Sequence, residues 1–208
     1  MTAASLLKQT ARSGVQPVDI SRHLGDLAHL MEVCFSAEMD ASGRALVSEM
    51  RFLSHFGPLL SVLGPLGLDQ QAWGLGHVWV ESGRVVGSVS TRRAAPRSTA
   101  WLIANVAVLP EYRRRGIALA MMQASLDFIR RQRGRQVLLQ VDDDHFGATE
   151  LYRQLGFARV TTQTAWVRPA GTAAPAHLPA PFDLRLRAPH EWADQFALAQ
   201  TVRPAGLA

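Results

Sequence analysis

Three consecutive arginines, Arg113, Arg114 and Arg115, stand directly before Gly116 and the start of a helical pattern. The first turn of any helix has four backbone N–H groups without an intrahelical partner, which a Ser, Thr, Asp or Asn usually caps. No such residue occurs at this junction. Cations at the positive end of a helix dipole are also unfavourable, by a few tenths to about 1 kcal/mol each. A bound anion would offset that cost and satisfy the N–H groups.

A pyrophosphate suits this turn best in size and charge. Helix N-termini bind phosphates through free N–H groups, a guanidinium matches phosphate geometry, and Gly116 and Ala118 let the anion approach the backbone. The alternative is a solvated run of surface arginines without function. Binding is favoured because the turn follows an apolar strand predicted at 99–109 and opens an amphipathic helix predicted at 116–133.

The segment "VAVLPEYRRRGIALAMMQ", residues 106–123, resembles the acyl-CoA binding segment of the GNAT superfamily of N-acetyltransferases. The signature of that segment is Q/R-x-x-G-x-G/A. Arg113, Gly116 and Ala118 match it in this sequence.

A second segment, "HFGATELYRQLGF" at 145–157, is similar to the family's N-x-x-A-x-x-L-Y-x-x-x-G-F pattern. The matching residues are Ala148, Leu151, Tyr152, Gly156 and Phe157. His145 departs from the pattern because the family has asparagine there. The resemblance covers about residues 15–168.

The resemblance implies how the cofactor would bind. The strands at 101–109 and 136–142 would splay apart at their ends, with the pantetheine arm between them. Backbone groups of Val106 and Val108 would bind the arm and the acetyl carbonyl, and one N–H would act as an oxyanion donor, worth roughly 3–4 kcal/mol. The residues implied to bind acetyl-CoA are Val106, Ala107, Val108, Arg113, Arg114, Arg115, Gly116, Ile117, Ala118 and His145.

The resemblance also implies that Tyr152 is the acid that protonates the leaving thiolate. A phenol with a pKa near 10 is close enough to a thiol near 8.5 for this transfer, and the attacking amine must be neutral. The alternative is that Tyr152 only packs, because it lies on the apolar stripe of a helix predicted at 147–157 and ended by Gly156.

His145 has three open roles: a cofactor contact in place of the asparagine, a base, or a residue that starts the helix. A histidine side chain can donate or accept a hydrogen bond. No general base is visible; Asn105 is not one, and many members of the family work through water. The candidate carboxylates are Asp142, Asp143, Asp144, Glu49 and Glu81.

Two helices are predicted near the N-terminus, at 21–35 and 42–56, with Ser21 as the N-cap of the first. Cys34 is expected in the core, with a nucleophile as the alternative that no His or Asp pattern supports. The apolar face of the first helix consists of Leu27, Leu30, Met31 and Cys34.

By the resemblance, the first two helices and the following loop, about 35–75, form the acceptor site. This region is apolar and broken by glycines, with a flexible wall or lid at 59–76, and it has few acids, which argues against an aminoglycoside. A protein N-terminus, a lysine and a small-molecule amine remain open. Trp73, Trp79 and Trp101 line an apolar cleft or pack in the core.

The order of strand, two helices, three strands, helix, strand, helix and strand predicts an α/β (α+β) protein. With the resemblance, this is the GNAT fold, a mixed, mostly antiparallel sheet of about six to seven strands flanked by helices. The strands are expected at 15–20, at 76–90 as a hairpin turning at Ser82-Gly83, and at 99–109, 135–142 and 157–168.

Four regions are expected along the chain. Residues 1–14 are a flexible tail and 15–168 the acetyltransferase domain. A Pro/Ala-rich linker follows at 169–182. Residues 183–208 are either a C-terminal tail or the start of a truncated second GNAT-like unit.

Composition narrows the class of protein. The 208 residues contain no apolar window long enough for a membrane span, and the polar start does not read as a signal peptide. The single cysteine fits a reducing compartment, so a cytoplasmic location is expected. No cluster of cysteines and histidines predicts a metal site.

The net charge of +5 comes almost entirely from arginine, which suits a phosphorylated ligand. Nucleic acid is disfavoured because these arginines gather at a helix start without interleaved aromatics. We therefore expect an acetyl-CoA-dependent N-acetyltransferase, an acyltransferase transferring groups other than aminoacyl, acting on a primary amine of a small molecule or protein. The alternative is an inactive acetyl-CoA-binding sensor or scaffold, and a homodimer is left open.

Overall fold

The computed structural model describes residues 13–37, 39–56, 76–164, 171, 185–186 and 188–201. The chain divides into two compact units, Met1–Leu151 and Tyr152–Ala208. The first unit contains β1 (Gly14–Pro17), α1 (Ile20–Phe35), α2 (Ala41–Ser54), β2 (Gly76–Glu81), β3 (Arg84–Arg93), β4 (Ala100–Val108), the 3-10 turn η3 (Pro110–Tyr112), α5 (Ile117–Arg131) and β5 (Gln136–Leu139). Helix α6 (Phe146–Gln154) crosses the boundary, and the second unit adds the turn η4 (Pro189–Glu191) and α7 (Trp192–Thr201).

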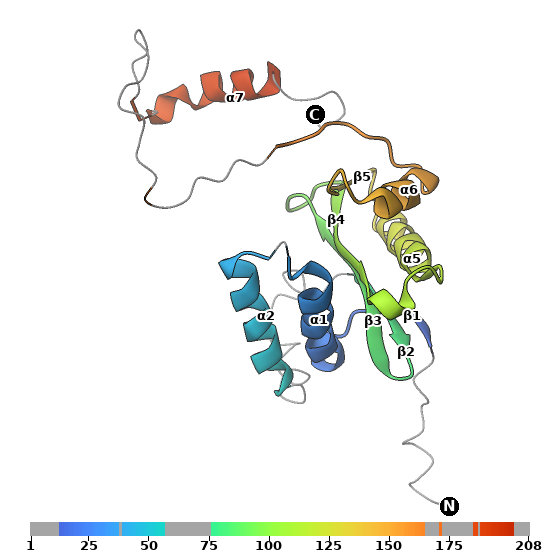
Figure 1. Ribbon diagram of the computed structural model, residues 1–208. Helices are drawn as coiled ribbons and strands as arrows, with labels where there is room; N and C mark the ends of the chain where they lie inside the picture. The colour runs from blue at the N-terminus through green and yellow to red at the C-terminus, as the bar shows by residue number, and fades with distance from the viewer. Residues whose placement is uncertain are drawn as a thin grey trace, which may run out of the picture. The chain divides into compact units, whose positions relative to one another are not determined.

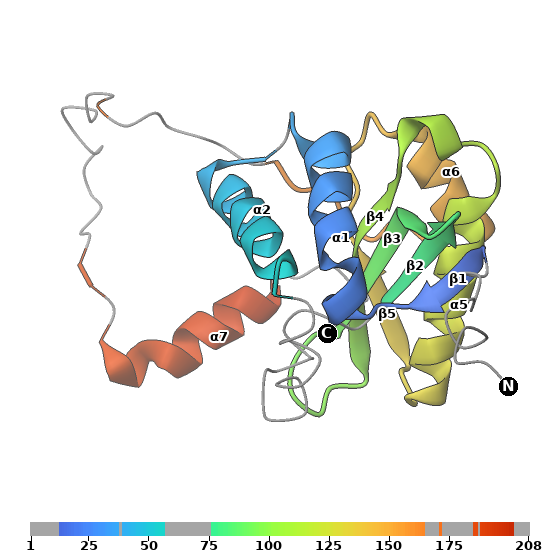
Figure 2. The same ribbon diagram turned by 90° about the horizontal axis from the view of Figure 1, so that it is seen from below.

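One mixed sheet organises the first unit. Strands β1 to β5 lie in chain order; β1 to β4 pair antiparallel, and β5 pairs parallel with β4. Helix α1 packs on one face of the sheet and α5 on the other, while α2 packs against α1 (Figures 1 and 2). The predicted α/β class with a mostly antiparallel sheet is confirmed.

The β2–β3 hairpin forms where the sequence predicted it, because Ser82 and Gly83 supply the turn. Their φ values are 51° and 81°, and two positive φ values in a two-residue loop match the twist of the flanking strands. The strands carry buried valines on both faces, which is typical of a sheet covered by helices on each side. These valines are Val78, Val80, Val85, Val86 and Val89.

Helix α5 and the sheet share an aromatic and polar core. Trp101 is buried and lies edge-on to Phe128, with ring centroids 5.7 Å apart, so it packs in the core instead of lining a cleft. His77 is also buried, with Nδ1 2.9 Å from the Ser125 hydroxyl of α5. Burial lowers the pKa of His77, and Arg131 lowers it further.

The N-cap of α1 is Asp19, so the prediction of Ser21 is wrong. The chain is still extended at Asp19, with φ −120°, and its carboxylate accepts from the backbone N–H of Ser21 at 3.0 Å. The helix therefore begins at Ile20. Its predicted apolar face is confirmed at Leu30, which is fully buried, and at Leu27, which packs against the hairpin valines.

The predicted strand at 157–168 is wrong over its described part. Residues 157–164 form no strand, and most of their side chains are exposed. Alternation of apolar residues is therefore not sufficient for a strand, which also needs a neighbouring strand to pair with. Strand β5 is also shorter than 135–142: it ends at Leu139, and a turn follows at Asp143-Asp144. The described sheet thus has five strands, where six to seven were expected.

The C-terminal region contains helix α7, and residues 185–186 and 188 are not in a strand. The predicted lid, with Trp73, and nearly all of the predicted tail and linker lie outside the described residues. Over the part of the chain that the structure covers, no helix is long and apolar enough to cross a membrane.

Candidate functional site

The turn between β4 and α5 has the features of an anion site. Arg114 and Gly116 both adopt left-handed backbone, with φ values of 63° and 75°. Gly116 is the N-cap of α5 and provides no side chain to cap it. The first intrahelical bond runs from the N–H of Ala120 to the carbonyl of Gly116 at 3.0 Å, so the N–H groups before it have no helical acceptor.

Backbone conformation explains why glycine occupies position 116. A Cβ there would meet no atom within 4 Å, so crowding is not the reason. The positive φ is the reason, because a non-glycine residue in this backbone region is less stable by roughly 1–2 kcal/mol. Arg114 accepts that strain, and strained backbone of this kind is concentrated at functional sites.

A β-bulge interrupts β4 just before this turn. Ser90 pairs with Ala104 and Ser88 with Ala107, so Asn105 and Val106 stand opposite the single residue Val89. Asn105 has a φ of 51°. A bulge leaves its extra residue outside the hydrogen-bond ladder, so backbone here can turn toward a ligand.

The pairing of β4 with β5 ends before β4 does. The last paired residues are Ile103 and Leu139, whereas β4 continues to Val108. Beyond Ile103, β4 therefore has no paired residue of β5 beside it, next to the bulge. The splaying of the two strands that the sequence resemblance implied stays a prediction.

The bulge of β4 and the start of α5 both lie within a segment that matches a known protein family. The family model described as "Acetyltransferase (GNAT) family" matches residues 49–157, just over half of the chain. The chain belongs to this family.

Two curated relatives support the assignment. The chain is 33% identical to N-alpha-acetyltransferase 30 of Schizosaccharomyces pombe over 84 residues, which are 39% of this chain and 56% of the relative. It is 31% identical to mycothiol acetyltransferase of Renibacterium salmoninarum over 67 residues, 32% of this chain and 20% of the relative. The chain thus spans about half of the first relative and a fifth of the second.

Solved structures confirm the fold. The ribosomal-protein-S18-alanine N-acetyltransferase of Escherichia coli superposes with a TM-score of 0.51 at 16% identity, covering 72% of this chain and 80% of that one. At this identity the likeness concerns the fold alone.

The three arginines of this GNAT turn have different contacts. The Nε of Arg113 donates to the Val108 carbonyl at 3.0 Å. Arg115 lies 3.6 Å from the Glu81 carboxylate and 4.9 Å above the Tyr112 ring. Arg114 is solvent-exposed. Glu81, one of the candidate bases, is thereby engaged by Arg115.

Sequence reasoning missed that Cys34 joins α1 to this site. Its thiol donates to the Val108 carbonyl at 3.6 Å, beside the bond from Arg113. The pKa of Cys34 is raised, chiefly by burial and against the opposing effect of Arg113, which favours the protonated thiol and a structural role. Two donors, from Cys34 and Arg113, therefore contact the Val108 carbonyl.

Tyr152 and His145 differ in burial. Tyr152, in the second unit, is buried, with its ring centroid 6.0 Å from that of Phe157, and burial raises its pKa. Gly156 (φ 85°) ends α6 as predicted, with the N–H of Phe157 donating to the Tyr152 carbonyl at 3.0 Å.

His145, in the first unit, is exposed and starts α6, accepting backbone bonds from Ala148 and Thr149. Its ring nitrogen and the carboxylates of Asp142 and Asp144 lie within 4.8 Å of one another, all exposed. This grouping places one predicted cofactor contact beside two of the candidate bases.

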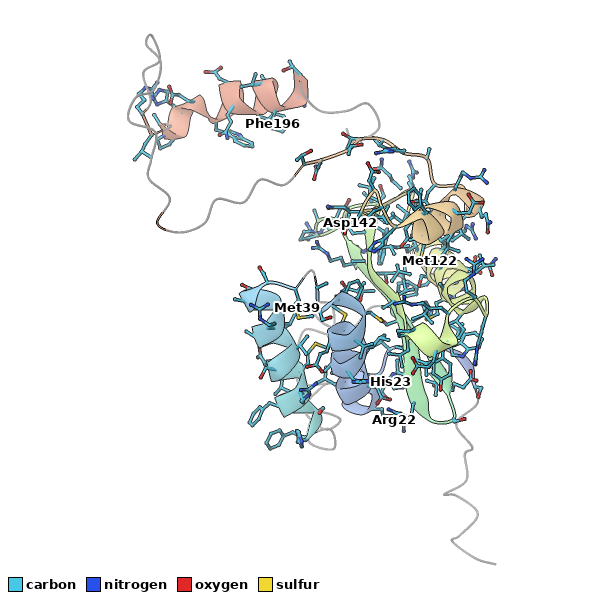
Figure 3. All side chains as sticks on the ribbon, in the orientation of Figure 1. Arg22, His23, Met39, Met122, Asp142 and Phe196 are labelled. Atoms are coloured by element: carbon cyan, nitrogen blue, oxygen red, sulfur yellow. The ribbon has the colours of Figure 1, made fainter. Side chains whose placement is uncertain are left out.

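A pocket of about 240 Å³ opens between α1 and α2. Met39, which contributes to it, is labelled in Figure 3. The described residues that line the pocket are Met31, Phe35, Met39, Gly43, Leu46, Val47, Met50 and Asn105. The pocket thus reaches the bulge of β4, and it falls in the region expected to bind the acceptor; Glu49 is exposed and is not part of the lining.

Proposed function

We propose that this GNAT protein is an acetyl-CoA-dependent N-acetyltransferase that acts on a primary amine. The observation that carries the proposal is the start of α5, where an uncapped helix N-terminus with two left-handed residues directly follows a bulged strand. When bound, acetyl-CoA supplies an acetyl group activated as a thioester.

The residues present fit its pyrophosphate. The N–H groups of Ile117, Ala118 and Leu119 precede the first intrahelical bond and would donate to phosphate oxygens. Arg114 is exposed at the same turn and adds a compensating charge. Gly116, without a Cβ, leaves the approach to these groups open.

The β4 bulge would bind the acetyl end of acetyl-CoA. A backbone N–H of Val106 or Val108 would donate to the acetyl carbonyl oxygen as negative charge develops on it, an effect worth about 3–4 kcal/mol per donor. The contacts of Cys34 and Arg113 with the Val108 carbonyl hold this part of the strand in place.

Proton transfer is assigned to Tyr152. A phenol is protonated at neutral pH already at its ordinary pKa near 10, as a donor to a leaving thiolate must be. Burial raises the pKa of Tyr152, which makes it a weaker acid than an exposed tyrosine. The attacking amine gives up its proton to water or to a carboxylate, and no single residue is assigned that role. The single cysteine of the chain fits a reducing compartment, so a cytoplasmic location is part of the proposal.

Turnover separates an enzyme from an acetyl-CoA-binding scaffold. The purified protein is incubated with acetyl-CoA and a mixture of primary amines, and acetylated products are identified by mass spectrometry. Enzyme-dependent acetamide formation supports the proposal. Binding of acetyl-CoA without any product from peptide, lysine or small amines would contradict it.

A further inference from the structure

The pocket between α1 and α2 is almost entirely apolar. Three of its lining residues are methionines, whose flexible side chains adapt to differently shaped apolar groups. A Cβ at Gly43 would lie 2.6 Å from the Cγ of Met39, so glycine lets Met39 keep this position. Among the described residues, the lining contains no Asp, Glu, Lys, Arg or His.

A charged group is therefore a poor occupant. Burying an ammonium group without a partner is costly, and the nearby ion pair between Glu32 and Arg51 is already formed and half-exposed. The amine itself must lie at the end of the pocket where polar groups are available.

Asn105 supplies those polar groups. It lines the pocket and directly precedes Val106, where the proposed function puts the acetyl carbonyl. Its carbonyl accepts from the Ser88 hydroxyl at 3.3 Å, while its Nδ2 lies a long 3.5 Å from the Ser90 hydroxyl. The carboxamide Oδ1 can accept from an amine N–H.

We propose that the acceptor is a primary amine bearing an apolar group about as large as one amino-acid side chain, which binds between α1 and α2 while Asn105 orients the amine. The volume of about 240 Å³ falls just below the roughly 300–1,000 Å³ of pockets that enclose whole small ligands, so it suits one substituent. This inference rests on the proposed N-acetyltransferase function.

The reaction that this implies is balanced. The amine nitrogen forms a C–N bond to the acetyl carbon as the C–S bond breaks. One proton leaves the amine nitrogen and one proton ends on the coenzyme A sulfur, giving an acetamide and a free thiol.

The test measures kcat/KM by mass spectrometry for two matched series of amines. One series is a peptide whose first residue is Gly, Ser, Leu or Phe; the other consists of ethylamine, ethanolamine, isoamylamine and phenethylamine. Burial of an apolar side chain is worth about 1.5–3 kcal/mol, so the apolar members should exceed the smallest by roughly ten- to a hundredfold. The series with the higher values identifies the source as a peptide N-terminus or a free amine.

Variants link the preference to the pocket. Leu46 and Val33 are both exposed apolar residues, at 43% and 41%, but only Leu46 lines the pocket. Leu46→Gln should lower the Leu-to-Gly ratio of kcat/KM several-fold, while Val33→Gln leaves it unchanged. Asn105→Gly, which keeps the left-handed backbone at no cost, should lower kcat/KM for all acceptors at least tenfold without changing acetyl-CoA binding.

These measurements distinguish a failure of this inference from a failure of the proposed function. Acetylation at equal rates across each series, or fastest with the polar members, would overturn the inference and leave the proposed function standing. No acetylation of any amine by a protein that binds acetyl-CoA would overturn both.

Discussion

Replacing Gly116 by alanine tests whether backbone conformation, rather than space, requires glycine at the start of α5. A Cβ at this position meets nothing within 4 Å, but the φ of 75° puts alanine in the left-handed region. The cost is about 1–2 kcal/mol. At roughly 2–4 °C per kcal/mol for a chain of this size, Gly116→Ala should lower Tm by about 2–8 °C.

Gly147 is the matched control. A Cβ there also meets nothing within 4 Å, but Gly147 lies within α6 and its φ is not positive. Gly147→Ala should therefore stabilise by about 0.5–1 kcal/mol, because glycine is the poorer helix former. Both variants are measured by thermal unfolding followed by circular dichroism. A Gly116→Ala protein as stable as the wild type, or stabilised like Gly147→Ala, would refute the reasoning.

Three further predictions concern titratable groups. Tyr152→Phe should lower kcat at least tenfold with little change in acetyl-CoA affinity; unchanged turnover would leave Tyr152 a packing residue. His145→Asn, which restores the family's residue, should change the Kd for acetyl-CoA measured by calorimetry, and an unaltered Kd would remove the case for a cofactor contact. Burial lowers the folded-state pKa values of His77 and His23 below their usual 6.5, so the unfolded state binds protons first. Stability is then fully present above pH 6.5 and falls as the pH drops through the folded pKa values. His77→Gln should flatten the fall in Tm between pH 7.5 and 5, and an equally steep fall would show that other groups cause it.

The sequence was informative where local chemistry decides the structure. Apolar periodicity predicted α1, α5 and the β2–β3 hairpin, and the absence of a capping residue before α5 pointed to the anion turn. The structure confirms the uncapped Gly116 there. The same reasoning failed for the N-cap of α1, since Ser21 and Asp19 are equally good caps by type and only the end of β1 decides between them.

Other features depend on pairing between distant segments. The bulge at Asn105 arises from the register of β3 against β4, which no residue pattern within β4 reveals. The bond from Cys34 to the Val108 carbonyl joins residues 74 positions apart. The strand predicted at 157–168 had suitable alternation, but strand formation requires a partner, and residues 157–164 pair with none in the described part of the sheet.

Binding of acetyl-CoA at the start of α5 is tested by thermal unfolding with and without acetyl-CoA. At about 100 times Kd, binding adds roughly 2.7 kcal/mol, or about 5–10 °C in Tm. Arg114 and Arg133 are both exposed arginines with left-handed backbone, at opposite ends of α5. Arg114→Ala should reduce the rise in Tm, while Arg133→Ala should preserve it. No rise with wild-type protein at millimolar acetyl-CoA, or equal rises in both variants, would contradict pyrophosphate binding at the start of α5.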